Sequence, residues 1–185
     1  HIIINNYKID NMDHTFLPLD IKCSLLSIDI IFICLPKNNI ESIKKIFSKF
    51  NISLNNIFCS SYAKSINYKN NFSSFENILI IDIGFGKTSV IYYKKNKICF
   101  FYTLPIGGNN ITKDISKILN IDLIDAEDIK ISFDKNEHTL NKKNISLEFT
   151  LKIIFARVEE ILELCVKYLK SSANEENMNF VYTLS

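Results

Sequence analysis

The chain has 185 residues, of which 47% are hydrophobic and 23% charged, so it can bury a sizeable core and is not a disordered tail. Its 22 basic and 20 acidic side chains leave a formal net charge of +2, which gives no electrostatic reason to expect nucleic acid as a partner. The sequence contains neither a long uncharged apolar stretch nor a signal-peptide pattern, so we expect a soluble protein.

The first part of the chain alternates short apolar runs with polar turns. Clusters of β-branched residues predict strands, and Ile and Phe at three-and-four spacing predict an amphipathic helix. We predict strands over residues 1–4 and 21–35 and a helix over 38–50. A short strand over 55–61, a helical turn over 62–66 and a linker over 67–74 follow. We expect a domain boundary in that linker, because its Asn, Ser and Lys residues offer little to bury.

The remaining residues carry the strongest pattern. The run over residues 77–83 is nearly continuously apolar, which predicts a central strand buried on both faces. A hairpin follows, in which Asn96 can adopt the positive φ of the turn. The predicted elements are strands over 90–93 and 98–104, helices over 109–119 and 125–131, a surface loop or short hairpin over 132–144, a long helix over 147–169, a linker over 171–177 and a last strand over 179–185.

The five cysteines are odd in number and show neither CxxC spacing nor paired histidines. This pattern argues against a zinc site and against a secreted disulfide framework. Most of them lie in apolar runs, so we expect small buried side chains in a reducing cytoplasm.

The run IDIGFGKT contains the pattern DxGxGxT directly after the predicted central strand. Gly84 and Gly86 allow a tight turn whose backbone amides can face an anion. Asp82 could hold a divalent cation through water, and the hydroxyl of Thr88 could bond a phosphate oxygen. The pattern is neither a Walker loop nor a Rossmann fingerprint, since both of those open a helix. An ordinary hairpin turn with an exposed Lys87 is the alternative.

Further blocks follow this turn in order: LPIGGNNITKDISKIL, DAEDIKI, IIFARVEEILELCVKYL and FVYTLS. Together they resemble the actin-like ATPase superfamily, and most closely its FtsA family of bacterial cell-division proteins. HIIINNYKID, PLDIKCSLLSIDIIFICLP and NNIFCSSYAKS resemble the inserted subdomain 1C of that family and its return into subdomain 1A. The resemblance covers essentially the whole chain. It implies an α/β, actin-like (ribonuclease H-like) ATPase fold, with a mixed β-sheet, flanking helices and a small α+β 1C insertion.

The resemblance also implies a division into subdomains. Residues 1–53 correspond to part of 1C, residues 54–74 to the return strand and connecting helix of 1A, and residues 75–185 to 2A and 2B with the second phosphate loop. Because the chain lacks an initiator Met and ends within a strand-like run, we expect it to be an incomplete piece of a longer protein. The first phosphate loop and the C-terminal amphipathic helix of the family would lie outside it.

The resemblance assigns site residues, with no confident catalytic residue among them. The residues that it assigns to binding of the nucleotide phosphates are Asp82, Gly84, Phe85, Gly86, Lys87 and Thr88. Asp82 would also hold Mg²⁺ through water. The resemblance assigns the ribose and adenine to Glu127 and Lys130, and gives weaker family positions at Gly107, Gly108, Arg157 and Thr183. From spacing alone, Glu127 and Lys130 share one helical face, where an i,i+3 salt bridge is equally open. A solvated charged face would explain Arg157, and Gly107 and Gly108 would serve backbone geometry.

The function that the resemblance implies is that of a full-length protein that binds ATP and Mg²⁺, polymerises, and links the FtsZ ring to the inner membrane. Implied partners are FtsZ, further copies in a filament, other divisome proteins through 1C, and the cytoplasmic face of the inner membrane at the division septum. Nucleic acid is not among them. We expect at most weak ATPase activity, and an inactive isolated segment that binds ATP poorly.

Departures from the family pattern leave two alternatives open. Phe85 occupies a position that normally has no side chain, and Leu184 and Ser185 replace the two glycines of the adenosine loop. Side chains there would crowd a nucleotide. The first alternative is a nucleotide-independent scaffold of the same fold. The second is a PilM-like relative of pilus assembly, against which the PxGG and AExxK blocks favour FtsA.

Overall fold

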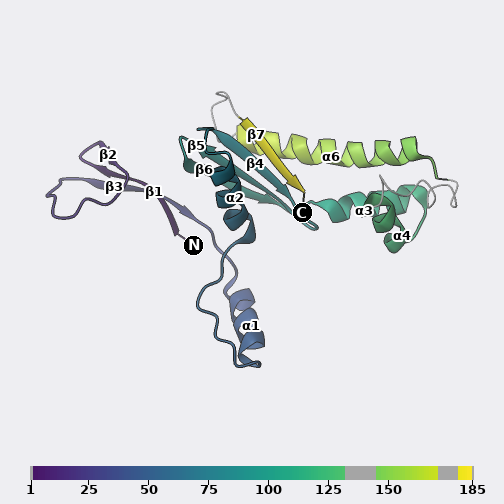
Figure 1. Cartoon of the computed structure of the whole chain (residues 1–185), viewed down its shortest axis with the longest axis horizontal. Helices are drawn as coiled ribbons and strands as arrows, with labels where there is room; N and C mark the ends of the chain where they lie inside the picture. Colours follow the sequence, from purple (N-terminus) through teal and green to yellow (C-terminus); the bar gives the residue numbers. More distant parts are fainter. Residues whose placement is uncertain (1, 132–144, 171–178, 185) are drawn as a thin grey trace. The chain divides into compact units, whose positions relative to one another are not determined.

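The computed structural model describes residues 2–131, 145–170 and 179–184 (Figure 1). The chain divides into two compact units, His1–Ser74 and Phe75–Ser185. The predicted loop over 132–144, the predicted linker over 171–177 and Ser185 lie outside the described residues.

The first unit contains a small antiparallel sheet with the strand order β2-β1-β3. Its elements are β1 (Ile2–Ile9), β2 (Met12–His14), β3 (Leu26–Phe32), α1 (Lys37–Ser48) and α2 (Ser60–Asn71). Asp10 and Asn11 connect β1 to β2 with φ angles of 46° and 70°, as a two-residue type I′ turn requires. The carboxylate of Asp10 accepts hydrogen bonds from the amides of Ser24 and Leu25, which holds the start of β3 beside this turn.

Two predictions for the first unit are wrong. Residues 55–59 form no strand, and most of the predicted linker over 67–74 belongs to helix α2. The buried positions of α2 are Ser61 and Ser65, one helical turn apart. Because the packed face of this helix is polar, a search for apolar periodicity could not find it.

The second unit is built on a mixed sheet with the strand order β6-β5-β4-β7. Its strands are β4 (Ile78–Ile83), β5 (Thr88–Lys94), β6 (Lys97–Leu104) and β7 (Asn179–Leu184). Strand β4 pairs antiparallel with β5 and parallel with β7. Every residue of β4 is buried, which confirms the predicted central strand. The β5–β6 turn places Asn96 at a φ of 65°, as expected.

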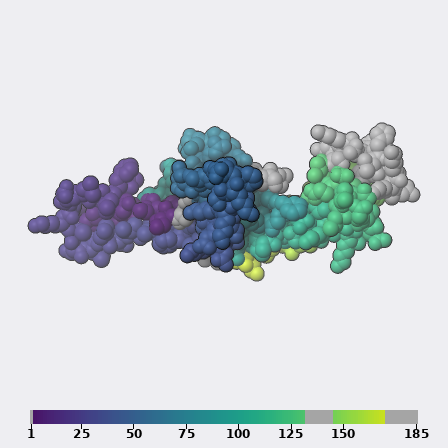
Figure 2. Space-filling model, turned by 90° about the horizontal axis from the view of Figure 1, so that it is seen from below, coloured from purple at the N-terminus to yellow at the C-terminus, as the bar shows by residue number. Residues whose placement is uncertain are grey.

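Three helices complete this unit: α3 (Gly108–Leu119), α4 (Leu123–Ile131) and α6 (Leu147–Lys170). The second half of α6 packs on the sheet through Ile161, Cys165 and Leu169. Nearer its start, Ile153 packs against α3 and α4. Helix α6 therefore joins the sheet to the helical pair, and Figure 1 shows it running alongside both, while Figure 2 shows α3 and α4 in green at the surface. None of the described helices is long and apolar enough to cross a membrane.

The cysteines differ from expectation. Only Cys165 is buried, Cys59 is half-buried, and Cys23, Cys34 and Cys99 are exposed. Burial raises the pKa of the Cys165 thiol to about 11. Because the thiolate is the reactive form, the raised pKa and the burial both disfavour reaction at Cys165 in the folded chain.

We therefore expect a thiol reagent at pH 8 to modify Cys23, Cys34 and Cys99 in the folded chain and to spare Cys165 until denaturant is added. Mass spectrometry of the proteolytic peptides would measure the extent at each site. Modification of Cys165 as fast as Cys99 under native conditions would contradict the packing of α6 on the sheet.

Candidate functional site

The loop between β4 and β5 is closed by its own backbone and by the start of α3. The amide of Gly84 donates to the carbonyl oxygen of Lys87 over 2.9 Å. The carbonyl oxygens of Gly84 and Phe85 accept hydrogen bonds from the amides of Gly108 and Asn109, at 2.9 and 2.7 Å. These two loop carbonyls therefore face the first turn of α3.

Unlike the two carbonyls, three of the loop amides have no bonding partner in the described chain. Within the residues that the structure describes, the N–H groups of Phe85, Gly86 and Lys87 donate to no acceptor, and the three residues are exposed. A Cβ atom added at Gly86 would meet nothing within 4 Å, and no glycine has a positive φ. The fold itself does not require glycine at position 86. Successive free amides in a turn form a concavity suited to an anion.

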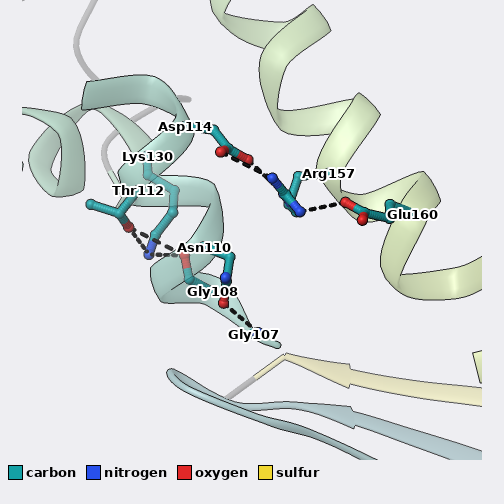
Figure 3. Close-up of polar contacts among 8 residues, drawn as sticks. All are labelled: Gly107, Gly108, Asn110, Thr112, Asp114, Lys130, Arg157 and Glu160. Atoms are coloured by element: carbon teal, nitrogen blue, oxygen red, sulfur yellow. Dashed lines mark hydrogen bonds and ion pairs between the residues drawn. The ribbon is translucent and has the colours of Figure 1, made fainter. Parts of the chain in front are cut away.

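Gly107 is the point of closest approach between α3 and the loop. A Cβ atom there would lie 2.3 Å from the oxygen of Gly84 and 2.8 Å from the nitrogen of Lys87. No larger residue fits without moving the loop. The amide of Gly107 donates to Oδ1 of Asn110 over 3.1 Å, which satisfies a backbone group at the helix start (Figure 3).

Glu127 and Lys130 form an ion pair on α4, and they contact α3 as well. The ammonium of Lys130 reaches Oε2 of Glu127 at 2.7 Å, Oγ1 of Thr112 at 2.8 Å and the carbonyl oxygen of Gly108 at 3.2 Å. The Thr112 hydroxyl also bonds Glu127. The i,i+3 salt bridge that the spacing left open is present, and a role in binding ribose or adenine stays a prediction.

The pKa of Glu127 reflects this network. Burial alone would raise it, but hydrogen bonds from Lys130 and Thr112, together with the charge of Lys130, lower the pKa below its ordinary value. The carboxylate is therefore ionised at neutral pH.

The structure brings this ion pair and the loop together at Gly108. A Cβ atom at Gly108 would lie 3.6 Å from Nζ of Lys130 and 3.7 Å from the oxygen of Gly84. Two motifs that are far apart in the sequence thus border the first turn of α3. The segment around that turn is the candidate site.

The other predicted phosphate residues lie at the ends of the paired strands. The side chain of Thr88 is fully buried, and its hydroxyl donates to the carbonyl oxygen of Ile106 over 2.7 Å. Asp82 is 6% exposed and lies opposite Ser89 of β5 and Thr183 of β7. Their roles toward phosphate or Mg²⁺ stay predictions.

Arg157 connects α6 to α3 and is not part of a solvated face. Its Nε and Nη2 atoms bond both carboxylate oxygens of Asp114, at 2.5 and 3.0 Å, and Nη1 bonds Glu160 (Figure 3). The hydrogen bond and charge of Asp114, with the charge of Glu160, raise the pKa of Arg157 despite its burial. The role of Asp114 could not be predicted from the sequence, because no local spacing relates this residue to Arg157.

Comparison with known proteins gives consistent matches. A family model described as "Cell division protein FtsA" matches residues 79–178. The cell division protein FtsA of Helicobacter pylori (strain ATCC 700392 / 26695) is 32% identical over 116 residues, which cover 63% of this chain and 24% of that protein. FtsA of Buchnera aphidicola subsp. Schizaphis graminum is 24% identical over 201 residues, covering 99% of this chain and 48% of the relative. The chain therefore spans only about a quarter to a half of these relatives' lengths.

Among solved structures, a chain of the "PilM-PilN type IV pilus biogenesis complex" matches with a TM-score of 0.66 and 12% identity, over 98% of this chain and 49% of that one. At this identity the match speaks for the fold alone. With the family match, it confirms the predicted α/β fold of the actin-like ATPase class.

The close approach at Gly107 predicts a difference between two glycines. Gly107→Ala should lower the free energy of unfolding by about 1–3 kcal/mol, because the new methyl group overlaps loop backbone atoms. Gly86→Ala is the matched control and should change it by less than about 0.5 kcal/mol. Urea unfolding measures both, and equal losses would contradict the packing of α3 on the loop.

The lowered pKa of Glu127 predicts a pH-dependent stability. At pH 7, Glu127→Gln should destabilise the chain by about 1–2 kcal/mol, because charge-assisted hydrogen bonds from Lys130 and Thr112 are weakened. Since the folded pKa lies below the ordinary value of 4.5, this advantage of the wild type is complete above that pH. It should be lost as the pH falls through the lowered folded value.

The control for this measurement is Glu148→Gln, which removes an exposed ion pair with Lys152 on α6. Its effect should stay below about 0.5 kcal/mol at every pH. Thermal unfolding at pH values from 3 to 7 (roughly the range around the ordinary carboxyl pKa) compares the two variants. A gap between wild type and Glu127→Gln that widens toward acid pH would contradict the assignment.

Proposed function

The chain belongs to the family of the cell division protein FtsA. We therefore propose that it is the part of an ATP-binding, actin-like cell-division protein that carries the second phosphate loop. In this proposal the loop over residues 84–87 receives the triphosphate, and the polar pair on α4 contacts the sugar or base. The full-length protein then links the FtsZ ring to the inner membrane. It carries at most a weak ATPase activity.

The observation that carries the proposal is the arrangement of the loop backbone. The carbonyls of Gly84 and Phe85 are bound to α3, while the amides of Phe85, Gly86 and Lys87 make no hydrogen bond within the described part of the chain. An anion of several oxygens can accept from such amides at once. The side chain of Lys87 adds a positive charge at the same exposed tip.

The glycine at position 86 supports the same conclusion. Its φ is not positive, and the space where a side chain would lie is open. Neither backbone strain nor a neighbouring atom of the described chain therefore accounts for a glycine. Close approach of a ligand to the backbone would account for it.

The residues present also fit a magnesium ion that arrives with the nucleotide. Mg²⁺ usually keeps several waters and needs only one or two carboxylates beside the substrate phosphates. Asp82, near the end of β4, places a carboxylate next to the loop. When bound, the ion would neutralise phosphate charge.

The proposed partners follow from the family rather than from the site. They are FtsZ, further copies in a filament, other divisome proteins through residues 1–53, and the cytoplasmic face of the inner membrane at the division site. The proposed subdomain division, with residues 54–74 returning to 1A and residues 75–185 forming 2A and 2B, agrees with the boundary between the two compact units. The PilM-PilN complex is an example of partner binding by another protein of this fold.

A nucleotide-independent scaffold is the second candidate, and Phe85 favours it. Phe85 is 65% exposed and lies in the loop whose amides donate to no acceptor of the described chain. An aromatic side chain there can compete with a phosphate group for the same space. This candidate keeps the fold and the partner surfaces but needs no ATP.

Calorimetry of ATP binding to the full-length protein would separate the two candidates. For the ATP-binding protein, Gly86→Val should weaken binding at least about tenfold, because its branched side chain fills the space beside the loop amides. Phe85→Gly is the matched change that removes bulk from the same loop, and it should bind at least as tightly as the wild type. Wild-type protein that fails to bind ATP yet cosediments with FtsZ would favour the scaffold, and unchanged affinity in Gly86→Val would remove the phosphate-loop assignment.

A further inference from the structure

Helix α3 is held to the loop at one end and to α6 farther along. At its start, the amides of Gly108 and Asn109 bond the loop carbonyls. Asp114 lies six positions after Gly108, or about 9 Å along the helix axis. A helix of this length is rigid over such a distance, so the position of Asp114 constrains the position of the first turn.

Arg157 holds Asp114 in a two-pronged ion pair. Both side chains are about a quarter exposed, at 24% and 26%. A planar guanidinium that bonds both carboxylate oxygens fixes direction as well as distance, which a lysine ammonium cannot do. Glu160 on the same helix bonds Nη1 and steadies the guanidinium from its other side.

Arg157 also stands at a structurally defined place on α6. It lies between Ile153, which packs against α3 and α4, and Ile161, which packs on the sheet. The arginine therefore projects from the segment of α6 that joins the two core clusters. The α6 backbone that carries this side chain is therefore held by packed residues before and after it.

We propose that Asp114 and Arg157 are positioning residues that press the first turn of α3 against the loop over residues 84–87. The pair acts through the helix: it keeps Gly108 and Asn109 bonded to the loop carbonyls, and so keeps the loop amides turned outward. The consequence for nucleotide affinity rests on the proposed function. The mechanical link between the pair and the loop holds whether or not the protein binds a nucleotide.

Amide hydrogen exchange tests this link without any ligand. In Asp114→Asn and in Arg157→Gln, the amides of Gly108 and Asn109 should exchange about tenfold faster than in the wild type. The amides of β4, and those near the end of α3, should change far less. Glu160→Gln is the matched control, because it removes a charge that contacts Arg157 but leaves the bond to Asp114.

The pattern of exchange distinguishes positioning from simple stabilisation. A pair that merely stabilises the packing would speed exchange equally throughout α3 and β4, and this result would overturn the proposal. Unchanged exchange at Gly108 and Asn109 would overturn it as well. The double variant that exchanges the two charges, Asp114→Arg with Arg157→Asp, should recover part of the protection.

A second measurement joins the inference to the proposed function. ATP affinity of the full-length protein should fall about tenfold in Arg157→Gln and stay within about twofold in Glu160→Gln. If the wild type binds no ATP, the proposed function fails, yet the exchange measurement still decides the role of the pair. If the wild type binds ATP and Arg157→Gln binds it equally well with normal exchange, the positioning role alone fails.

Discussion

The structure of the second unit depends on the contact between the loop over residues 84–87 and the first turn of α3. A helix begins with backbone amides that have no partner inside the helix. Here the carbonyls of Gly84 and Phe85 accept from Gly108 and Asn109, so the loop serves as the cap of α3. The same contact sets the orientation of the loop, because its carbonyls are turned inward and its remaining amides are left at the surface. One set of hydrogen bonds thus caps the helix and leaves exposed the loop amides that we propose bind an anion.

Helix α6 gives this contact its support. One part of the helix packs on the sheet that carries the loop, and another part packs on α3 and α4. The loop and helix α3 are therefore both supported by one rigid element, α6. The ion pair between Arg157 and Asp114 adds a directional polar bond to these apolar contacts.

Sequence patterns predicted the parts of this arrangement that depend on local order. The continuous apolar run of β4, the glycine-containing turn and the periodicity of α3 and α6 each reflect the geometry of one element, so they were found. Asp114 was missed because its partner is 43 positions away and no repeat links them. Helix α2 was partly read as a linker, since its buried positions are serines. The exposed Cys99 was also misjudged: it lies in an apolar run, but on a strand at the edge of the sheet.

Strand β7 runs in the same direction as β4 and pairs with it from Ile78 opposite Asn179 to Ile83 opposite Leu184. Parallel neighbours finish at the same rim of a sheet, so the last residues of β7 arrive beside Gly84 although the intervening helices separate them along the chain. The pairing of β7 with β4 is made by main-chain N–H and C=O groups, and every amino acid except proline supplies both. Substitution of side chains on β7 can therefore proceed a long way before the rim itself is displaced, so this edge of the sheet tolerates a sequence as rich in isoleucine, asparagine and lysine as this one.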